Sequence, residues 1–325
     1  MTALIAPATI PNRPLLGRVT WHRPLLVLAV AMLLLAVWSA IGIGIDPRIV
    51  TGAPLWAKPF KFAVSIGVYS LTLSWLIGML SRAKRLAWWM GTVAAIFLAV
   101  EIAIIVGAAA SDTTSHFNVS TPFHAALWST MAISIIFVWS AAIPLAVLLF
   151  RSHLGDPART IAIRAGLIVA IIGMALGFLM TFPTGTQLTD YQGIVGAHTV
   201  GLPDGGPGLP LLGWSTVGGD LRIPHFVGMH ALQLIPLSVL ILEVLSRRIP
   251  RLQDATVRRG IAWTIVTLYV AVLTILTVQA EAGQSIVHPG VVTVAVTSLV
   301  FFASAVAIGT ILTRARPTGS LLTKA

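Results

Sequence analysis

The sequence predicts an all-α integral membrane protein with about eight transmembrane helices, and three observations support this class. Of the 325 residues, 57% are hydrophobic and only 10% are charged, whereas a soluble domain carries about 25% charged residues. The apolar residues form runs long enough to cross a bilayer, which takes about 20 residues. The alternating pattern of a membrane β-barrel is absent, so each run is predicted to be a helix that satisfies its own backbone hydrogen bonds.

Eight apolar runs follow one another along the chain and form a single membrane domain, residues 1–325. The predicted helices span residues 24–44, 60–80, 87–109, 125–149, 160–182, 226–246, 261–280 and 291–313. The first run follows three arginines, as the apolar core of a signal peptide would. It is longer than a typical signal sequence, and no small-residue cleavage motif follows it. An uncleaved first helix is therefore expected.

The basic residues indicate how these helices are oriented. Seventeen of the 21 Lys and Arg residues fall in the two tails and in the loops on one side of the predicted helices. The other side holds Arg48, Lys58, Lys61 and Arg222. Because short loops rich in Lys and Arg stay in the cytoplasm, both termini are predicted to be cytoplasmic, with the protein in the cell inner (plasma) membrane.

Composition and missing motifs exclude several classes of function. The net charge of +11 is spread over short loops rather than one basic face, which argues against a nucleic-acid partner. The chain has no cysteine, which excludes disulfides, thiolate metal sites and cysteine nucleophiles. The motifs of P-loop, dinucleotide-binding, zinc-protease and serine-hydrolase proteins are absent. The expected partners are the lipid bilayer and, as open alternatives, other membrane proteins or a second copy of this chain.

The long connection at residues 183–224 lies on the outer side of the predicted membrane domain. It is rich in glycine and proline and contains the run Asp204-Gly205-Gly206-Pro207-Gly208. Long loops are usually either functional lids or disordered segments. The apolar residues of this loop, among them Leu202 and Trp214, favour an ordered cap over the outer face.

Six of the eight histidines lie in or beside this outer side: His116, His124, His198, His225, His230 and His288. Imidazole is the commonest metal ligand and an axial ligand of haem. Histidines gathered with carboxylates on one membrane face therefore predict a site for haem or a transition metal, Cu, Fe or Zn. The candidate metal ligands are His116, His124, His225, His230 and His288, and His230 is favoured because it lies about one turn inside the apolar zone. The alternative is that these histidines only cap helices at the interface.

Polar residues inside the predicted helices supply further candidates. Glu101 lies in an otherwise apolar run, and a carboxyl group inside a membrane costs at least a few kcal/mol and marks a functional site by default. Lys58, Lys61 and Tyr69 fall on one polar face of the second helix, where the lysines would hold a carboxylate, a phosphate or a haem propionate. These four residues are the candidate cofactor-binding residues.

Glu243 lies near the cytoplasmic end of the sixth predicted helix. Residues four apart on a helix are neighbours, so Glu243 is predicted to pair with Arg247 in a structural role.

Short matches between the two halves of the chain would suit an internal repeat. Pro59-Phe60-Lys61-Phe62 opens the second predicted helix, and Pro224-His225-Phe226 opens the sixth. Such halves would be parallel and related by an axis along the membrane normal. In outline this plan resembles the haem A synthase family, which has eight helices in two parallel four-helix halves and a site toward the outer face. The resemblance extends to architecture alone, because that family has paired histidines within its helices, whereas only His230 lies clearly inside one here.

Three hypotheses of function follow. The first is a membrane redox or metal-handling protein with haem or a transition metal on the outer histidines. The second is a proton-coupled transporter of a small molecule or ion, with polar helix faces along its path and Glu101 as the coupling site. The third is a non-catalytic subunit or assembly factor of a membrane complex, in which the histidines are structural.

Overall fold

The computed structural model describes residues 19–314, and within them eight helices are long and apolar enough to span a membrane. This confirms the predicted all-α class. The spanning helices are α1 (Arg23–Ile45), α2 (Ala57–Met79), α3 (Lys84–Ala110), α4 (Pro122–Phe150), α5 (Pro157–Leu176), α7 (Arg222–Leu245), α8 (Ala255–Glu281) and α9 (Val291–Arg314). The basic residues Arg13, Arg18, Arg316 and Lys324, which enter the charge comparison, lie outside the described residues.

Most of these helices begin about a turn earlier than predicted, because a polar first turn precedes the apolar run. Thr121 caps α4 by accepting a hydrogen bond from the amide of His124, and Asp156 caps α5 in the same way. Proline follows both caps, at the first helical position, where its missing N–H is not needed. A prediction from the apolar runs alone therefore omits the polar first turn and makes most helices about one turn too short at the N-terminal end.

Short elements connect the spanning helices. Two 3₁₀ turns, η1 (Gly177–Thr181) and η2 (Pro250–Gln253), follow α5 and α7, and α6 (Gly185–Thr189) is a single helical turn. Strand β1 (Ile49–Val50) pairs antiparallel with β2 (Ala53–Pro54), and β3 (Thr199–Val200) pairs antiparallel with β4 (Gly219–Asp220).

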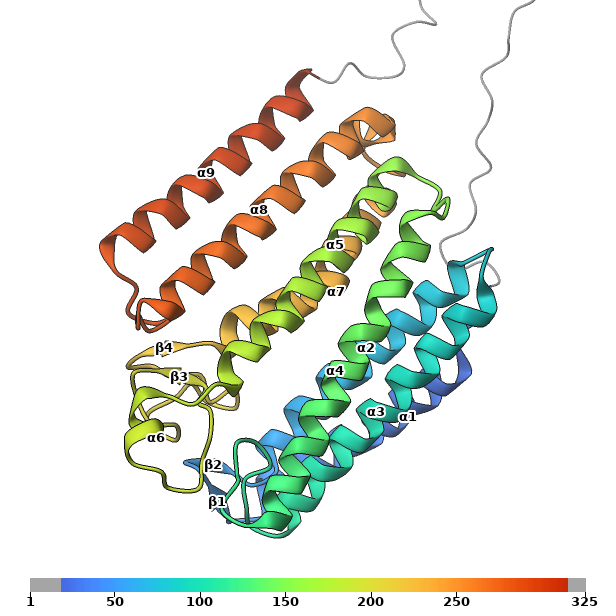
Figure 1. Ribbon diagram of the computed structural model, residues 1–325. Coiled ribbons are helices and arrows are strands. Elements are labelled where there is room, and N and C mark those ends of the chain that lie inside the picture. The colour runs from blue at the N-terminus through green and yellow to red at the C-terminus, as the bar shows by residue number, and fades with distance from the viewer. Residues whose placement is uncertain (1–18, 315–325) are drawn as a thin grey trace, which may run out of the picture.

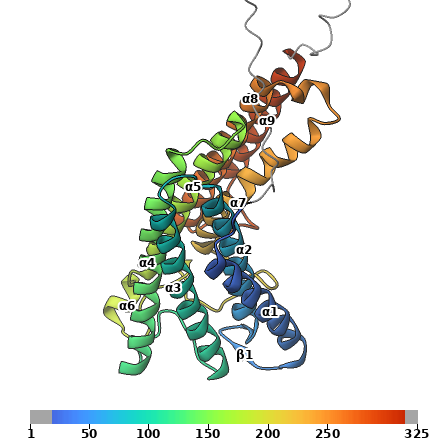
Figure 2. The same ribbon diagram turned by 90° about the vertical axis from the view of Figure 1, so that its right-hand side faces the viewer.

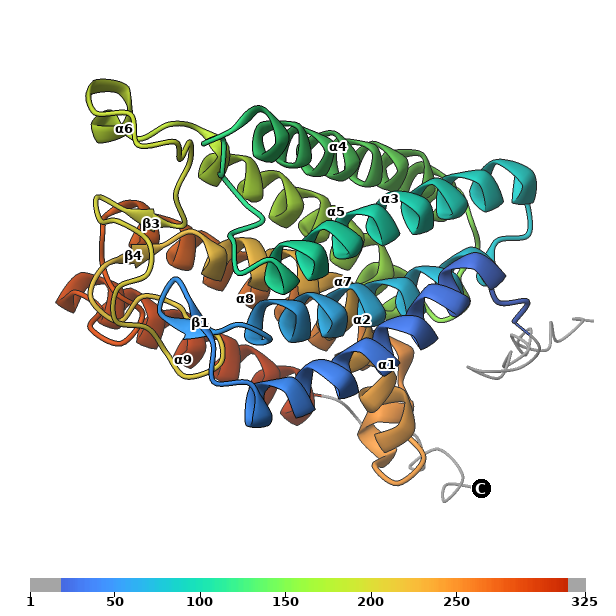
Figure 3. The same ribbon diagram turned by 90° about the horizontal axis from the view of Figure 1, so that it is seen from below.

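The spanning helices pack as two groups of four with the same order of contacts. In the first group α1 packs on α2 and α3, and α3 packs on α2 and α4. In the second group α5 packs on α7 and α8, and α8 packs on α7 and α9. Figures 1 and 3 show the two groups side by side, joined where α4 meets α5 and where α2 meets α7. The recurring order is the one that a parallel internal repeat requires.

The contact between α2 and α7 lies at the centre of this repeat. Ser65 Oγ of α2 is 3.4 Å from His230 Nε2 of α7, and these residues are 165 positions apart in the chain. Pro59 and Pro224, which open the two helices, have the same separation. Equivalent residues of two parallel repeats would touch only near the axis that relates them, so a repeat of this kind would have its axis between α2 and α7.

Glycines bring α5 and α7 into backbone contact. A methyl group on Gly173 of α5 would collide with the backbone of Gly228 on α7, and one on Gly166 would crowd the carbonyl of Ala231. Small residues allow such close approach inside membranes, where packing rather than water expulsion holds helices together.

All four strands and α6 lie at one end of the bundle, which we call the loop end (residues 46–56, 111–121, 182–221 and 282–290; Figures 1 and 2). Its largest part is the cap loop, residues 182–221, and the structure confirms that this loop is ordered. Val119 N donates to Gly193 O at 2.8 Å, and Val195 N donates to Phe117 O at 2.9 Å. The cap loop is thereby attached to the loop between α3 and α4, so it spans both groups of helices.

The ion pairs near the opposite end correct one prediction. Glu243 does not pair with Arg247, because its carboxylate accepts hydrogen bonds from Arg159 of α5, at 3.0 Å from Nε and 2.5 Å from Nη2. Arg159 faces Glu243 across the α5–α7 interface, where both side chains are mostly buried, and a bidentate pair from a neighbouring helix is stronger than an exposed pair along one helix. The structural role of Glu243 stands, with a different partner.

Candidate anion-binding chamber

A chamber of about 1130 Å³ lies at the loop end beneath the cap loop. Its floor is formed by the first turns of α2 and the last turns of α3, and its walls by residues 113–117 and by the β1–β2 hairpin. The glycine-rich stretch 201–208 of the cap loop closes over it. The chamber therefore collects residues from segments that lie far apart in the sequence.

Two helices begin at the chamber: α2 has its positive end toward it, whereas the first amide of α7 already donates to Asp220 Oδ1 at 3.0 Å. Ala57 and Lys58 of the first turn of α2 line it, as does Arg222, the first residue of α7. Trp56, which precedes α2, makes no side-chain capping bond to that first turn. The amide groups of a helix N-terminus carry partial positive charge and favour anions. The electrostatic potential at this end of the chamber is therefore made positive by a helix N-terminus together with cationic side chains.

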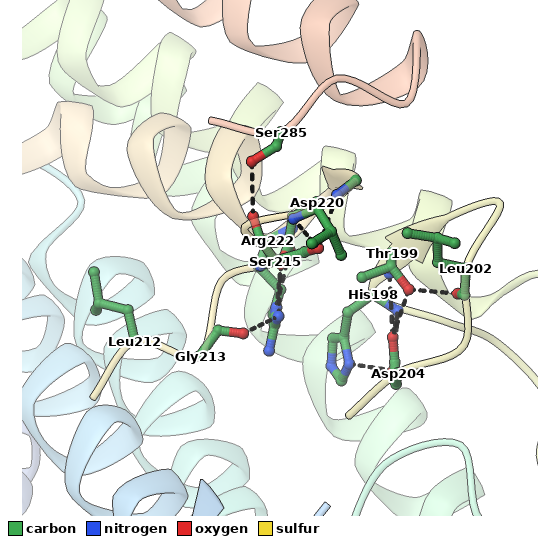
Figure 4. Close-up of polar contacts among 12 residues, drawn as sticks. His198, Thr199, Leu202, Asp204, Leu212, Gly213, Ser215, Asp220, Arg222 and Ser285 are labelled. Atoms are coloured by element: carbon green, nitrogen blue, oxygen red, sulfur yellow. Dashed lines mark hydrogen bonds and ion pairs between the residues drawn. The ribbon is translucent and has the colours of Figure 1, made fainter. Parts of the chain in front are cut away.

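Two of the three cations that line the chamber hold the cap loop in place. Lys61 Nζ donates a 2.8 Å hydrogen bond to the carbonyl of Leu212. Arg222 donates from Nη2 to the carbonyl of Gly213 at 2.5 Å and pairs with Asp220 at 2.6 Å, as Figure 4 shows for Arg222. Asp220 is 1% exposed and also accepts a bond from the amide of Ser215. Lys61 and Arg222 therefore have structural partners already.

Lys58 is different. Within residues 19–314 its ammonium group has neither a hydrogen-bond nor an ion-pair partner, although its side chain is half-buried and lines the chamber. The cations Lys61 and Arg222 and the acids Glu101 and Asp204 are near enough to act on it electrostatically. A cation withdrawn from water without a fixed partner costs free energy, which an anion bound in the chamber would offset.

Glu101 and His116 form a second pair, at the inner side of the chamber. Glu101 is 2% exposed, its Oε1 atom lies 3.8 Å from His116 Nε2, and its Oε2 atom has no partner among the described residues. His116 lines the chamber, packs against Phe62 and Trp128, and bonds Ser115 Oγ through Nδ1 at 3.0 Å. Burial and then the charge of Lys58 lower the pKa of His116 well below its usual value, so this imidazole is neutral at neutral pH.

His198 and Asp204, both in the cap loop, form a third pair. His198 Nδ1 lies 2.5 Å from Asp204 Oδ2, and the same carboxylate accepts bonds from the amides of His198 and Thr199 and from the Thr199 hydroxyl (Figure 4). The His198 ring also packs against Phe117. Burial lowers the pKa of His198 more than Asp204 raises it. Burial is the largest influence on Asp204 and opposes its ionisation, but the hydrogen bonds from His198 and Thr199 and the charge of His198 together outweigh it, and the pKa of Asp204 falls to about 2.

Sequence reasoning did not select His198 or Asp204 as site residues. Both lie outside the helices, in a glycine-rich stretch where no periodicity fixes the direction of a side chain. Asp204 accepts bonds from amides five and six residues before it, at Thr199 and His198. The path of the loop determines such a contact, and no local sequence motif signals it.

The structure does not bring the five predicted metal-ligating histidines together. His124 bonds Thr121 in the N-terminal cap of α4, and the exposed His288 bonds the carbonyl of Thr216. His225 bonds the carbonyl of Gly173 on α5, whereas His230 points toward Ser65 of α2 and bonds Gln233 on its own helix. Of these five histidines, only His116 lines the chamber. In residues 19–314 no group of three or more His, Asp or Glu side chains is arranged to hold a metal ion.

The four predicted cofactor-binding residues also lie in different places, and only two of them line the chamber. Lys58 and Lys61 line the chamber, and Glu101 lies behind His116. Tyr69 lies two turns deeper along α2 and packs against the core of the first helix group. Its hydroxyl is buried and has no partner within the described part of the chain.

No family model, curated protein or solved structure matches this chain.

Proposed function

We propose that this multi-pass membrane protein binds an anionic molecule, through a phosphate or carboxylate group, in the chamber at its loop end. The observation that carries the proposal is Lys58, a cation in the first turn of α2 that lines the chamber and has no partner in residues 19–314. The positive end of α2 supports the same ligand class, because a fixed dipole and an ammonium group together favour an anion. Lys61 and Arg222 add positive charge and hold the cap loop over the ligand.

We further propose that the protein lies in the inner membrane with its loop end outside the cytoplasm. The distribution of lysine and arginine supports this orientation. In it, the chamber faces the periplasm or the exterior, and the bound anion comes from that side or from the outer leaflet of the bilayer.

Thermal stability of the detergent-purified protein tests anion binding. A ligand that binds only the folded protein raises its stability by an amount that grows with concentration, about 2.7 kcal/mol at 100 times the dissociation constant. Inorganic phosphate, compared with chloride at the same ionic strength, should raise the melting temperature of the unmodified protein by a few degrees. Lys58→Gln should lose most of this increase.

Lys84→Gln is the matched control, since Lys84 is an exposed lysine at the first turn of α3, away from the chamber. It should respond to phosphate as the unmodified protein does. An equal response in Lys58→Gln and the unmodified protein would contradict the proposal.

The cofactor hypothesis, haem or a transition metal, remains a second candidate on one observation. His198 is held by Asp204 through Nδ1, the arrangement in which metal-ligating histidines are usually oriented, and Lys58 would suit a haem propionate. An ultraviolet–visible spectrum and elemental analysis of the purified protein test it. A Soret band or a stoichiometric metal that disappears in His198→Gln would support this candidate, and a colourless, metal-free protein would remove it.

A further inference from the structure

We propose that the chamber is a hydrolytic site for phosphate esters, in which His198, oriented by Asp204, acts as the general base. This activity rests on the proposed binding of an anion at Lys58, and it adds a reaction to that binding site.

The hydrogen bonds of Asp204 determine the state of His198. An ionised carboxylate only accepts hydrogen bonds, so the 2.5 Å contact requires that His198 Nδ1 carries a proton and donates it. Nε2 of the neutral ring then has a lone pair, and no group among residues 19–314 bonds to it. Bonds from the amides of His198 and Thr199 fix Asp204 in turn. A carboxylate that holds an imidazole in one tautomer is the arrangement of a general base.

The charges near this base select the substrate class. His198, Lys58 and Arg222 line one chamber. Asp204 and the cations Arg222 and Lys58 act on His198 electrostatically, and His198 in turn acts on His116. A carboxylic ester is neutral and would gain little from these cations in its ground state. A phosphate ester is already an anion, and its transition state spreads negative charge over the phosphoryl oxygens. Cations and a base in one chamber therefore suit phosphate-ester hydrolysis.

The reaction uses water as its second reactant and needs no redox partner. A water oxygen attacks phosphorus while its proton passes to His198 Nε2, and the bond between phosphorus and the leaving oxygen breaks. The leaving oxygen takes a proton from water at the open end of the chamber, and His198 later returns its proton to water. Lys58 neutralises charge on the phosphoryl oxygens, a role for which preorganised cations are effective.

A purely structural role for the pair accounts for part of the geometry. The bonds from Asp204 to the backbone of residues 198 and 199 would stabilise the turn even if His198 were absent. They do not account for an imidazole that lines a cationic chamber and has a ring nitrogen without a protein partner. The test therefore needs a readout that separates turnover from stability.

Turnover of two soluble probes, para-nitrophenyl phosphate and bis-para-nitrophenyl phosphate, is measured with the full-length protein in detergent. Release of headgroups from vesicles that contain phosphatidic acid and phosphatidylglycerol is measured in parallel with the reconstituted protein. The soluble and lipid assays together show whether the ester comes from solution or from the bilayer. We expect His198→Gln to lower kcat by about 10²- to 10⁴-fold, the usual contribution of a general base, with little change in KM.

Asp204→Asn is the second variant, because an amide in place of the carboxylate keeps the shape of the turn but no longer fixes the imidazole tautomer. It should also lower kcat strongly. His153→Gln is the control, since His153 is exposed in the loop between α4 and α5 at the other end of the bundle. Its turnover should equal that of the unmodified protein.

The pH profile distinguishes a base from a structural residue. Because burial lowers the pKa of His198 from its usual value in the ligand-free protein, kcat/KM should rise with pH below neutrality and then reach a plateau. The residual activity of His198→Gln should not show this rise with pH. The same rise in His198→Gln would show that another group titrates, and it would overturn the assignment of the base.

Phosphate binding, measured by thermal stability, separates failure of this activity from failure of the proposed function. Binding that depends on Lys58 without turnover of any probe would overturn the hydrolytic site and leave anion binding intact. Neither binding nor turnover would overturn both. Turnover that is abolished by a chelator and restored by a metal would overturn the role of His198 as a base and favour a metal-ligand role.

Discussion

At the scale of single residues, Glu101 is one of the two acids that act electrostatically on Lys58. Its carboxyl group is buried, with one oxygen near His116 and the other without a partner among the described residues. When ionised, it competes with a bound anion for the charge of Lys58. Glu101→Gln should therefore tighten phosphate binding, by about three- to tenfold if the interaction is on the order of 1 kcal/mol, when binding is measured by thermal stability at a pH at which the carboxyl group of the unmodified protein is ionised.

The same substitution tests proton coupling, the second hypothesis from the sequence. In the unmodified protein, phosphate binding should strengthen as pH falls and Glu101 takes up a proton. In Glu101→Gln this part of the pH dependence should be missing, and a dependence that stays the same would exclude Glu101 as the coupled group. Glu281→Gln, at the exposed last residue of α8, is the control and should leave the profile unchanged.

His198 and Asp204 predict that the cap loop loosens in acid. A histidine whose pKa is lowered in the folded state binds fewer protons there than in the unfolded state, so its contribution to stability is present above pH 6.5 and is lost as pH falls through the folded pKa. Asp204, with its pKa lowered to about 2, adds stability above pH 4 that is lost as pH falls toward 2. Hydrogen exchange of residues 198–204, corrected for intrinsic rates, should show less protection at pH 5 than at pH 7. Equal protection would contradict the buried pair.

At the scale of helices, the closest packing is that of α5 on α7 through Gly173 and Gly228. Gly173→Ala forces a methyl group into the backbone of Gly228, so the two helices must separate. Overpacking of this kind costs about 1–3 kcal/mol, and the melting temperature should fall by several degrees.

Gly309→Ala is the helical control for this substitution, because no atom lies within 4 Å of a methyl group at that position of α9. Alanine favours a helix over glycine by about 1 kcal/mol, so the control should be as stable as the unmodified protein or more stable. A similar loss in both variants would show that the α5–α7 contact is not the cause.

At the scale of the whole molecule, the lack of cysteine makes the proposed orientation directly testable. A single cysteine at Leu188, which is 73% exposed in α6 of the cap loop, should react with a membrane-impermeant maleimide in intact spheroplasts. A single cysteine at Arg82, exposed between α2 and α3, should react only after the membrane is opened. The reverse pattern would place the chamber on the cytoplasmic side.

The architecture and part of the chamber could be predicted from the sequence. Each spanning helix is a continuous apolar run, and in a bilayer such a run has to satisfy its backbone hydrogen bonds within itself. Lys58, Lys61 and Glu101 stand out for the related reason that charged groups are rare in such runs. These inferences depend on the composition of one local segment and need no knowledge of its neighbours.

The grouping of side chains depends on the tertiary structure. His225 and His230 belong to one helix, yet they face α5 and α2, because the packing of α7 between these helices gives each side of it a different neighbour. The path of the cap loop brings His198 to Asp204 and places both in the chamber that the first turn of α2 also lines. By itself the sequence determined which segments cross the membrane, since that depends on local hydrophobicity. The tertiary structure decided which polar groups share a chamber, because helix rotation and loop path bring together residues that the chain keeps far apart.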